Sequence, residues 1–289
     1  MILVNGATGA LGQAVAERLA GGSWVAGVRR HRASLPDALL IDEDGSVAPG
    51  SLDGIETIIN CAGRIDGTAV EVERANVTHP VNLARVAKSS GVRAFVQVSS
   101  FSVYGLAERI DHTTGLRPAG LYAETKAAAE RQLLAFADER FAVVILRLPF
   151  MFDRHRPSLV GSLIRIFRHL PMVPAPASPI RRSMISYGDA AYLLADLARR
   201  RSSGILAAAD PLPFTYALLL KHMEHLDFHT PRIVPVPDRI TGLVTRVMPR
   251  LGRRLFHSSL LAPSANLAAH HKLPIGLAAE LDATLRGMA

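Results

Sequence analysis

The first half of the chain alternates short apolar runs with segments of helical periodicity. Apolar runs of about four to eight residues are typical of strands buried in a parallel sheet, and apolar positions three and four residues apart are typical of the helices that cover it. The pattern therefore predicts an α/β fold with a doubly wound parallel sheet. The predicted strands are residues 1–5, 24–28, 38–41, 57–60, 94–98 and 141–148, and the predicted helices are residues 9–20, 76–90 and 122–138.

The second half has another character, because prolines interrupt it from Pro149 onward. Between them the pattern predicts helices over residues 158–169, 188–200 and 215–225 and a strand over residues 182–186. We place the domain boundary between Leu148 and Pro149. Residues 1–148 then form the sheet domain. Residues 149–289 form smaller elements near the carboxyl edge of the sheet, where ligands bind in open parallel sheets, and some of them return to the sheet domain.

Composition narrows the class of protein. Hydrophobic residues make up 49% of the chain and charged residues 20%, which is typical of a globular protein and excludes a disordered one. The single cysteine, Cys61, cannot form a disulfide within the chain, which indicates a reducing compartment. Its place after an apolar strand favours a small buried hydrophobe over a nucleophile. Without a signal peptide or a long apolar run, we expect a cytoplasmic protein with no stable membrane insertion.

The net charge of +8 could attract nucleic acid, anionic lipid or phosphorylated small molecules. Because the arginines are spread through the chain, we expect no nucleic-acid partner. Residues 240–255 mix apolar side chains such as Leu243 and Val247 with arginines such as Arg246. This segment fits either a helix on a membrane surface or, more commonly, a packed helix with snorkelling arginines, and Pro249 interrupts it. We predict no metal site.

A glycine-rich turn joins the first predicted strand to the first predicted helix. Glycines at this place let backbone N–H groups approach a pyrophosphate at the positive end of the helix dipole. Gly6 would permit the tight turn, Gly9 the approach of phosphates, and Gly12 the packing of helix on strand. The sequence thus predicts dinucleotide binding by Gly6, Thr8, Gly9, Ala10, Leu11 and Gly12.

The end of the second predicted strand indicates which dinucleotide binds. An Asp or Glu there would bond the ribose hydroxyls of NAD, whereas an arginine would accommodate the extra phosphate of NADP. This strand is followed by Arg29 and Arg30 without a carboxylate, so we expect NADP in preference to NAD, the alternative being a solvated loop. Asp42 could contact the adenine edge or could be a plain turn aspartate.

Tyr122 and Lys126 are four residues apart at the start of a predicted helix and lie on one face of it. A free tyrosine titrates at about 10, and a cation beside it should lower the pKa of the phenol. Tyr122 could then exchange the hydroxyl proton while hydride moves to or from a nicotinamide, and Lys126 could also bond the nicotinamide ribose.

Three serines follow the strand at residues 94–98. A serine hydroxyl at the carboxyl end of a parallel strand faces the cofactor crevice and can donate a hydrogen bond to a substrate carbonyl. From position alone Ser99, Ser100 and Ser102 compete for this role, and each could instead belong to a turn.

As a set, these residues resemble the extended short-chain dehydrogenase/reductase family, of the NAD(P)-dependent sugar-nucleotide epimerase/dehydratase type. The matching segments follow in the order of the family and cover roughly the first two thirds of the chain. They are Gly6–Gly12, Asn60-Cys61-Ala62-Gly63, Asn76-Val77, Val98–Gly105, Tyr122–Glu130 and Arg147-Leu148-Pro149.

The resemblance implies a Rossmann-like sheet with a small C-terminal substrate-binding domain, and a catalytic set of Ser100, Tyr122 and Lys126. It places Ser102 as a neighbouring hydroxyl at the substrate. It implies a homodimer formed through two helices per subunit, here those that start at Val81 and Tyr122. It also adds cofactor contacts from Cys61, Ala62, Gly63, Asn76, Leu148 and Pro149.

Two positions bear on the substrate. Sugar-nucleotide enzymes of this family usually place an Asn after the sixth strand against the diphosphate-sugar, but the matching residue here is Phe150. Arg182, ahead of Asp189, takes the place of an arginine that often binds the diphosphate, the alternative being a solvated strand end.

The sequence therefore predicts hydride transfer at a nucleotide-linked sugar, either 4-keto reduction or 4-epimerisation. Phe150 favours a second hypothesis, an NADPH-dependent reductase of a non-sugar ketone. A third is a non-catalytic NADP-sensing or assembly protein, which would have no need of Ser100, Tyr122 and Lys126 together.

Overall fold

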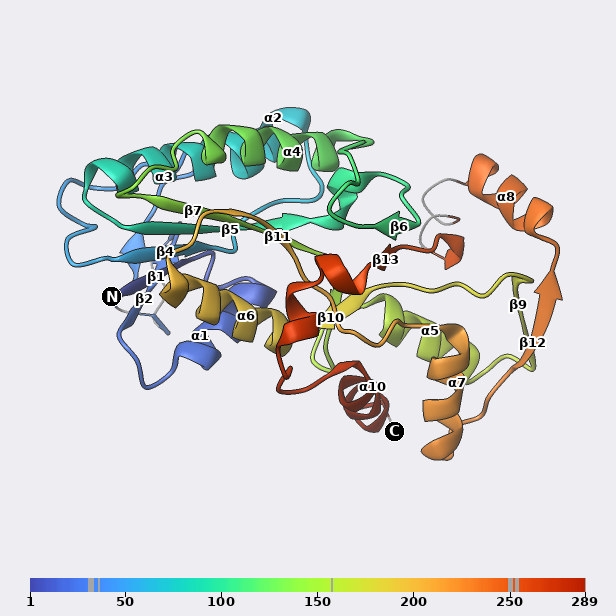
Figure 1. Cartoon of the computed structure of the whole chain (residues 1–289). Coiled ribbons are helices and arrows are strands. Elements are labelled where there is room, and N and C mark those ends of the chain that lie inside the picture. Colours follow the sequence, from blue (N-terminus) through green and yellow to red (C-terminus); the bar gives the residue numbers. More distant parts are fainter. Residues whose placement is uncertain (31–33, 36, 157, 249–251, 253–254, 289) are drawn as a thin grey trace. The chain divides into compact units, whose positions relative to one another are not determined.

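The computed structural model describes residues 1–30, 34–35, 37–156, 158–248, 252 and 255–288. Two compact units, each built from three stretches of chain, make up the fold, and Figure 1 colours them along the sequence. The sheet unit comprises residues 1–105, 115–149 and 187–208, and the second unit comprises residues 106–114, 150–186 and 209–289.

The sheet unit is built on seven parallel strands in the order β11-β7-β5-β4-β1-β2-β3. Its central strands β4 and β7 are buried along their whole length, as expected for a sheet that is covered on both faces. The strands are β1 (Ile2–Asn5), β2 (Trp24–Val28), β3 (Leu39–Leu40), β4 (Thr57–Asn60), β5 (Ala94–Ser100), β7 (Ala142–Leu148) and β11 (Gly204–Ala207).

Helices cover both faces of this sheet (Figure 1). On one face, α1 (Ala10–Leu19) packs against α6 (Tyr187–Arg200). On the other lie α2 (Ala69–Glu73), α3 (His79–Ser89) and α4 (Leu121–Leu134). The core under α3 and α4 contains one registered row across four strands, whose fully buried members are Leu3, Ile58, Phe95 and Val143.

The predicted fold class is confirmed, and β2 and β4 have the predicted bounds. The predicted helix over residues 76–90 differs, because α3 begins at His79 after a π-helical turn over Arg74–Thr78. A separate helix, α2, precedes that turn, since Thr68 and Glu71 form a capping box at its start. Asn76 therefore lies in a turn whose backbone is wider than that of an α-helix.

In its described residues, the second unit contains three two-stranded parallel sheets. They are β8 (Phe150–Phe152) with β10 (Met184–Ser186), β9 (Met172–Pro176) with β12 (Arg232–Val236), and β6 (Arg109–Ile110) with β13 (Leu260–Leu261). Its helices are α5 (Leu159–Phe167), α7 (Tyr216–His225), α8 (Asp238–Val247) and α10 (Leu277–Arg286). Side chains of α5, α7 and α10 form its core with Phe152 and Phe214.

Within the described residues, no helix has the length and apolar character needed to cross a bilayer.

Candidate functional site

The turn between β1 and α1 holds its glycines close to the loop after β4. Gly6 has a φ of +77°, and a Cβ on it would lie 2.8 Å from the backbone nitrogen of Ala62. A Cβ on Gly12 would overlap the carbonyl oxygen of Gly6. Gly9 is exposed and caps α1 without a side-chain hydrogen bond, so the backbone N–H groups of the first turn face an anion directly.

The loop after β4 is held in place by Asn76, which is buried. Its side-chain oxygen accepts from the backbone nitrogen of Arg64 at 2.9 Å, and its amide nitrogen donates to the carbonyl of Arg64 at 2.8 Å. The same nitrogen donates to the hydroxyl of Thr125 on α4 at 3.1 Å. Asn76 thus fixes Cys61, Ala62 and Gly63 beside α4.

A chain of buried side-chain amides runs across the sheet at the strand ends. Asn5 donates to the side-chain oxygen of Asn60 at 2.7 Å, and Asn60 donates to Gln97 at 2.7 Å. These three residues are paired in register on β1, β4 and β5. The nitrogen of Asn5 also lies 2.7 Å from Nε2 of His79 on α3. Such a chain stays buried because each member has a partner.

The glycine turn, the loop after β4 and α2 enclose a cavity of about 410 Å³, a size usual for ligand pockets. Gly6, Thr8, Gly9 and Arg29 line it together with Cys61, Ala62 and Gly63, as the sequence analysis expected for a dinucleotide site. The backbone turn and the cationic edge fit an anionic dinucleotide, because the glycines leave room where a Cβ would block it.

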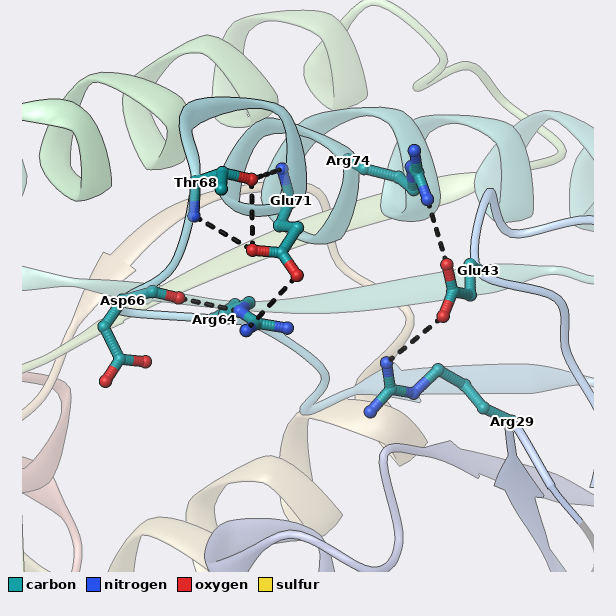
Figure 2. Close-up of polar contacts among 7 residues, drawn as sticks. All are labelled: Arg29, Glu43, Arg64, Asp66, Thr68, Glu71 and Arg74. Atoms are coloured by element: carbon teal, nitrogen blue, oxygen red, sulfur yellow. Dashed lines mark hydrogen bonds and ion pairs between the residues drawn. The ribbon is translucent and has the colours of Figure 1, made fainter.

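Charged side chains form the rim of this cavity (Figure 2). Glu43 lies 2.9 Å from a guanidinium nitrogen of Arg74 and 4.0 Å from one of Arg29. Arg64 donates to the carbonyl of Asp66 at 2.7 Å and lies 3.6 Å from Glu71. The rim therefore carries the carboxylates of Glu43 and Glu71 as well as several arginines.

The ion pairs of the rim could not be read from the sequence. The segment after β2 contains no carboxylate, but the loop after β3 brings Glu43 next to Arg29. The motif Thr68-Ala69-Val70-Glu71 could have indicated the start of α2, yet the approach of Arg74 to Glu43 joins residues 31 positions apart and has no local signal.

The remaining predicted cofactor residues are not among those that line this cavity. Arg30 and Asp42 line an adjoining cavity of about 370 Å³ together with Thr8, Arg29 and Glu43. Asp42 is exposed in a turn that its backbone nitrogen closes on the carbonyl of Ser46 at 2.9 Å. The first turn of α1 contains Ala10, Leu11 and Gly12. Leu148 is the last residue of β7, and Pro149 comes directly after it.

Ser100, Tyr122 and Lys126 come together at the carboxyl end of β5. The Ser100 hydroxyl is close enough to Tyr122 to lower the pKa of its phenol, and the Ser100 oxygen accepts from the backbone nitrogen of Ser102 at 3.1 Å. The buried Lys126 donates to the carbonyl of Val98 at 3.1 Å and lies 5.9 Å from the centroid of the Tyr122 ring. The structure thus brings the three predicted catalytic residues close together.

Lys126 also borders the dinucleotide cavity, because a Cβ on Gly63 would lie 3.1 Å from its ammonium nitrogen. The hydroxyl oxygen of Ser102 is buried and has no hydrogen-bond partner among the described residues. A buried hydroxyl without a partner is costly unless a bound molecule satisfies it, which is consistent with the substrate contact expected of Ser102.

Burial controls the titration of the catalytic side chains. It raises the pKa of Tyr122, and the hydrogen bond with Ser100 opposes that rise. The expected lowering by Lys126 is therefore wrong for this structure, because burial dominates the pKa of Tyr122. Burial also lowers the pKa of Lys126 to about 8. Burial raises the pKa of the Cys61 thiol to about 12, which rules out a reactive thiolate at neutral pH.

A buried ion pair anchors the catalytic helix to the sheet. Glu130 on α4 accepts from Arg147 on β7 at 2.6 Å and from the hydroxyl of Ser99 at 2.5 Å. Arg147 also donates to the hydroxyl of Tyr104 at 3.0 Å. Because Glu130 is one turn beyond Lys126, the pair fixes the helix that positions both Tyr122 and Lys126.

Phe150 and Arg182, the two predicted substrate residues of the second unit, contact each other. The guanidinium of Arg182 lies 5.5 Å from the centroid of the Phe150 ring and donates to the carbonyl of His257 at 2.6 Å. Arg182 is buried, and burial lowers its pKa. The alternative of a solvated strand end is wrong, because the side chain is packed inside the unit.

Comparisons with known proteins agree with the motifs. The model of the NAD dependent epimerase/dehydratase family matches residues 2–169. The UDP-glucose 4-epimerase of Vibrio cholerae is 27% identical over 213 residues, which are 67% of this chain and 65% of that protein.

A second relative covers more of the chain. The ceramide reductase of Caulobacter vibrioides (strain NA1000 / CB15N) is 27% identical over 259 residues, which are 85% of this chain and 75% of that protein. The solved structure of MoeE5 in complex with UDP-glucose and NAD covers 100% of this chain and 99% of its own, with 23% identity and a TM-score of 0.72. At that identity the likeness to MoeE5 supports the fold alone.

Proposed function

The chain belongs to the NAD dependent epimerase/dehydratase family and is an NAD(P)-dependent enzyme of the extended short-chain dehydrogenase/reductase type, and from that premise we propose the reaction that it catalyses. The reaction is hydride transfer between the dinucleotide and a carbon that alternates between alcohol and ketone. The observation that carries the proposal is that Ser100 and Lys126 both lie beside Tyr122, with Lys126 at the edge of the dinucleotide cavity.

The nicotinamide supplies or accepts the hydride when it is bound. Tyr122 gives or takes the hydroxyl proton of the substrate, and Ser100 donates a hydrogen bond to the oxygen of the carbonyl. Lys126, which donates to the carbonyl of Val98 and borders the cavity at Gly63, holds the nicotinamide ribose. The buried hydroxyl of Ser102 forms a hydrogen bond with the substrate.

The rim residues support the use of either dinucleotide. Arg29 and Arg30, with Arg74, offer guanidinium groups to the extra phosphate of NADP. Glu43 offers a carboxylate to the ribose hydroxyls of NAD. We keep NADP as the preferred cofactor, because three arginines (Arg29, Arg30 and Arg74) outnumber two carboxylates (Asp42 and Glu43) at this edge.

The substrate that we propose first is a nucleotide-linked sugar, which undergoes 4-keto reduction or 4-epimerisation. The family match and the relative named UDP-glucose 4-epimerase support it. The homodimer through the helices that start at Val81 and Tyr122 stays a prediction.

A second candidate is reduction of a non-sugar ketone. Phe150 occupies the place of the diphosphate-contacting Asn, and Arg182 is packed against it and donates to His257. An arginine engaged in this way has less capacity to bind a diphosphate. The relative named ceramide reductase, which aligns with 85% of the chain, also supports this candidate.

The first test is to denature the purified protein and identify any released dinucleotide by mass. A retained NAD or NADP favours an epimerase, which oxidises and then reduces its substrate on one cofactor. A protein that is empty and binds NADPH favours a reductase, and its oxidation of NADPH is then followed with keto-sugar nucleotides and with simple and long-chain ketones. A protein that binds neither dinucleotide would refute the proposal.

Tyr122→Phe tests the proton donor. The variant should lose about 10²- to 10⁴-fold in kcat, the usual contribution of a general acid or base, while its affinity for dinucleotide stays nearly unchanged. Tyr192→Phe, which alters a tyrosine on α6, is the matched control and should keep full turnover. Full turnover by Tyr122→Phe would show that another group moves the proton.

A further inference from the structure

The polarity of α8 in the second unit is the reverse of that of a packed helix. Its one buried residue is Thr241, whereas Ile240, Leu243 and Val247 are 47%, 60% and 71% exposed. The more common interpretation of this segment, a helix that packs its apolar side chains, is therefore wrong for the described residues of α8. Large apolar side chains gathered on one exposed surface mark an interaction site.

The spacing of these residues defines one stripe. Positions 240, 243 and 247 are three and four residues apart and so lie on the same face of the helix. Arg239 and Arg246 are both exposed. They are seven residues apart, so both lie along the same side of the stripe. An apolar stripe bordered by arginines is the pattern of helices that lie in the plane of a membrane interface.

The surrounding sequence has strongly biased charge. Between residues 228 and 279 it holds six arginines but one acidic residue, Asp238. Asp238 is engaged at the start of α8, where it accepts from the hydroxyl of Ser178 at 2.7 Å. Strand β12 leads into α8 (Figure 1). Helix α8 thus combines exposed apolar side chains with exposed arginines, which are complementary to anionic lipid.

We propose that the α8 stripe (Ile240, Leu243 and Val247, with Arg239 and Arg246) binds the surface of an anionic lipid bilayer. The apolar side chains enter the boundary between headgroups and acyl chains, and the arginines contact lipid phosphates. The attachment is peripheral. It stands independently of the reaction proposed above, although it would bring the active site to any substrate that resides in a membrane.

The test is co-sedimentation of the full chain with phosphatidylglycerol vesicles and with phosphatidylcholine vesicles, without cofactor or substrate. The protein should bind the phosphatidylglycerol vesicles at least about tenfold more tightly, and rising salt should weaken that binding. The double variant Leu243→Ser with Val247→Ser should lose about tenfold in affinity, as should Arg239→Gln with Arg246→Gln. Both alter exposed side chains, and circular dichroism checks that the variants fold.

Two control variants carry matched changes elsewhere. Leu212→Ser removes an exposed apolar side chain and Arg140→Gln an exposed charge, and neither should alter vesicle binding. The proposal is overturned if the wild-type chain does not bind phosphatidylglycerol vesicles, or if the α8 variants bind as well as wild type. It is also overturned if α8 proves to be a contact between two copies, which analytical ultracentrifugation would reveal as self-association lost in the same variants. Dinucleotide binding is measured in parallel, so failure here leaves the proposed reaction untouched.

Discussion

The two sides of the dinucleotide cavity are stabilised in different ways. On the inner wall, Asn5, Asn60, His79 and Lys126 are buried, and each forms a hydrogen bond with a specified partner. On the rim, Arg29, Glu43 and Arg74 form ion pairs whose side chains are exposed. Buried polar groups are costly to leave unpaired, whereas exposed ion pairs contribute little. The inner wall should therefore tolerate few substitutions, and the rim should tolerate many with a change in ligand preference.

The strongest test of this comparison lies behind the inner wall. Glu130→Gln would leave the charge of Arg147 buried without a carboxylate, and we expect the free energy of unfolding to fall by about 3–5 kcal/mol. Urea denaturation measures this change. Glu139→Gln removes an exposed carboxylate from the loop after α4 and should change stability by less than about 0.5 kcal/mol. A loss for Glu130→Gln as small as that of the control would show that the buried pair does not anchor α4.

A pH series sharpens the comparison at Lys126. The pKa of its ammonium group is about 8 in the folded chain, whereas the ordinary value for a lysine, which we take for the unfolded chain, is 10.5. Between these values the unfolded chain binds a proton that the folded chain does not, so the contribution of Lys126 to stability rises with pH by about 1.4 kcal/mol per unit. Lys126→Met lacks this dependence.

The free energy of unfolding of wild type minus that of Lys126→Met should therefore increase by about 3 kcal/mol from pH 8 to pH 10.5. Lys221 is an exposed lysine on α7 and serves as the control. The free energy of unfolding of wild type minus that of Lys221→Met should not change over the same pH range. A flat difference for Lys126→Met as well would mean that the ammonium group is solvated in the folded protein.

The smallest expected effect on stability belongs to the rim, where Glu43→Gln should change it by less than about 1 kcal/mol. Removal of the carboxylate beside Arg29 and Arg74 should strengthen binding of NADPH relative to NADH, on the order of fivefold for one charge near a surface. Isothermal titration with both dinucleotides gives the ratio. Glu73→Gln removes a carboxylate next to Arg74 in the sequence and should leave the ratio of NADPH to NADH affinity unchanged. An equal change of that ratio in both variants would show that net charge alone causes it.

The sequence predicted those elements whose signal is local. Strand β4 was delimited residue by residue because Thr57–Asn60 is a continuous buried run between polar turns. The short strand β11 was missed, because the apolar run from Ile205 to Ala209 is mostly alanine, which is uncommon in strands. Exposed edge strands carry a weaker pattern than central ones.

The same division holds for the site. Gly6, Gly9, Tyr122 and Lys126 could be identified because each lies at a fixed spacing within one strand, turn or helix. The contact of Glu43 with Arg74 and that of Glu130 with Arg147 arise only when distant segments meet, and the charges of these residues are those of any solvated surface. The titration of Tyr122 could not be predicted either, because burial depends on the packed structure.

The chain leaves the sheet unit at Pro149 and returns to it at Tyr187, and this interruption has a consequence for synthesis on the ribosome. Helix α6, which packs on α1 and receives a hydrogen bond from Thr57 at the carbonyl of Ala198, is made only after residues 150–186. Strand β11, which covers the edge of β7, follows later still. A nascent chain halted near residue 149 would expose the part of one sheet face that α6 covers and the edge of β7, so cooperative folding of this unit must wait until residue 208 has emerged.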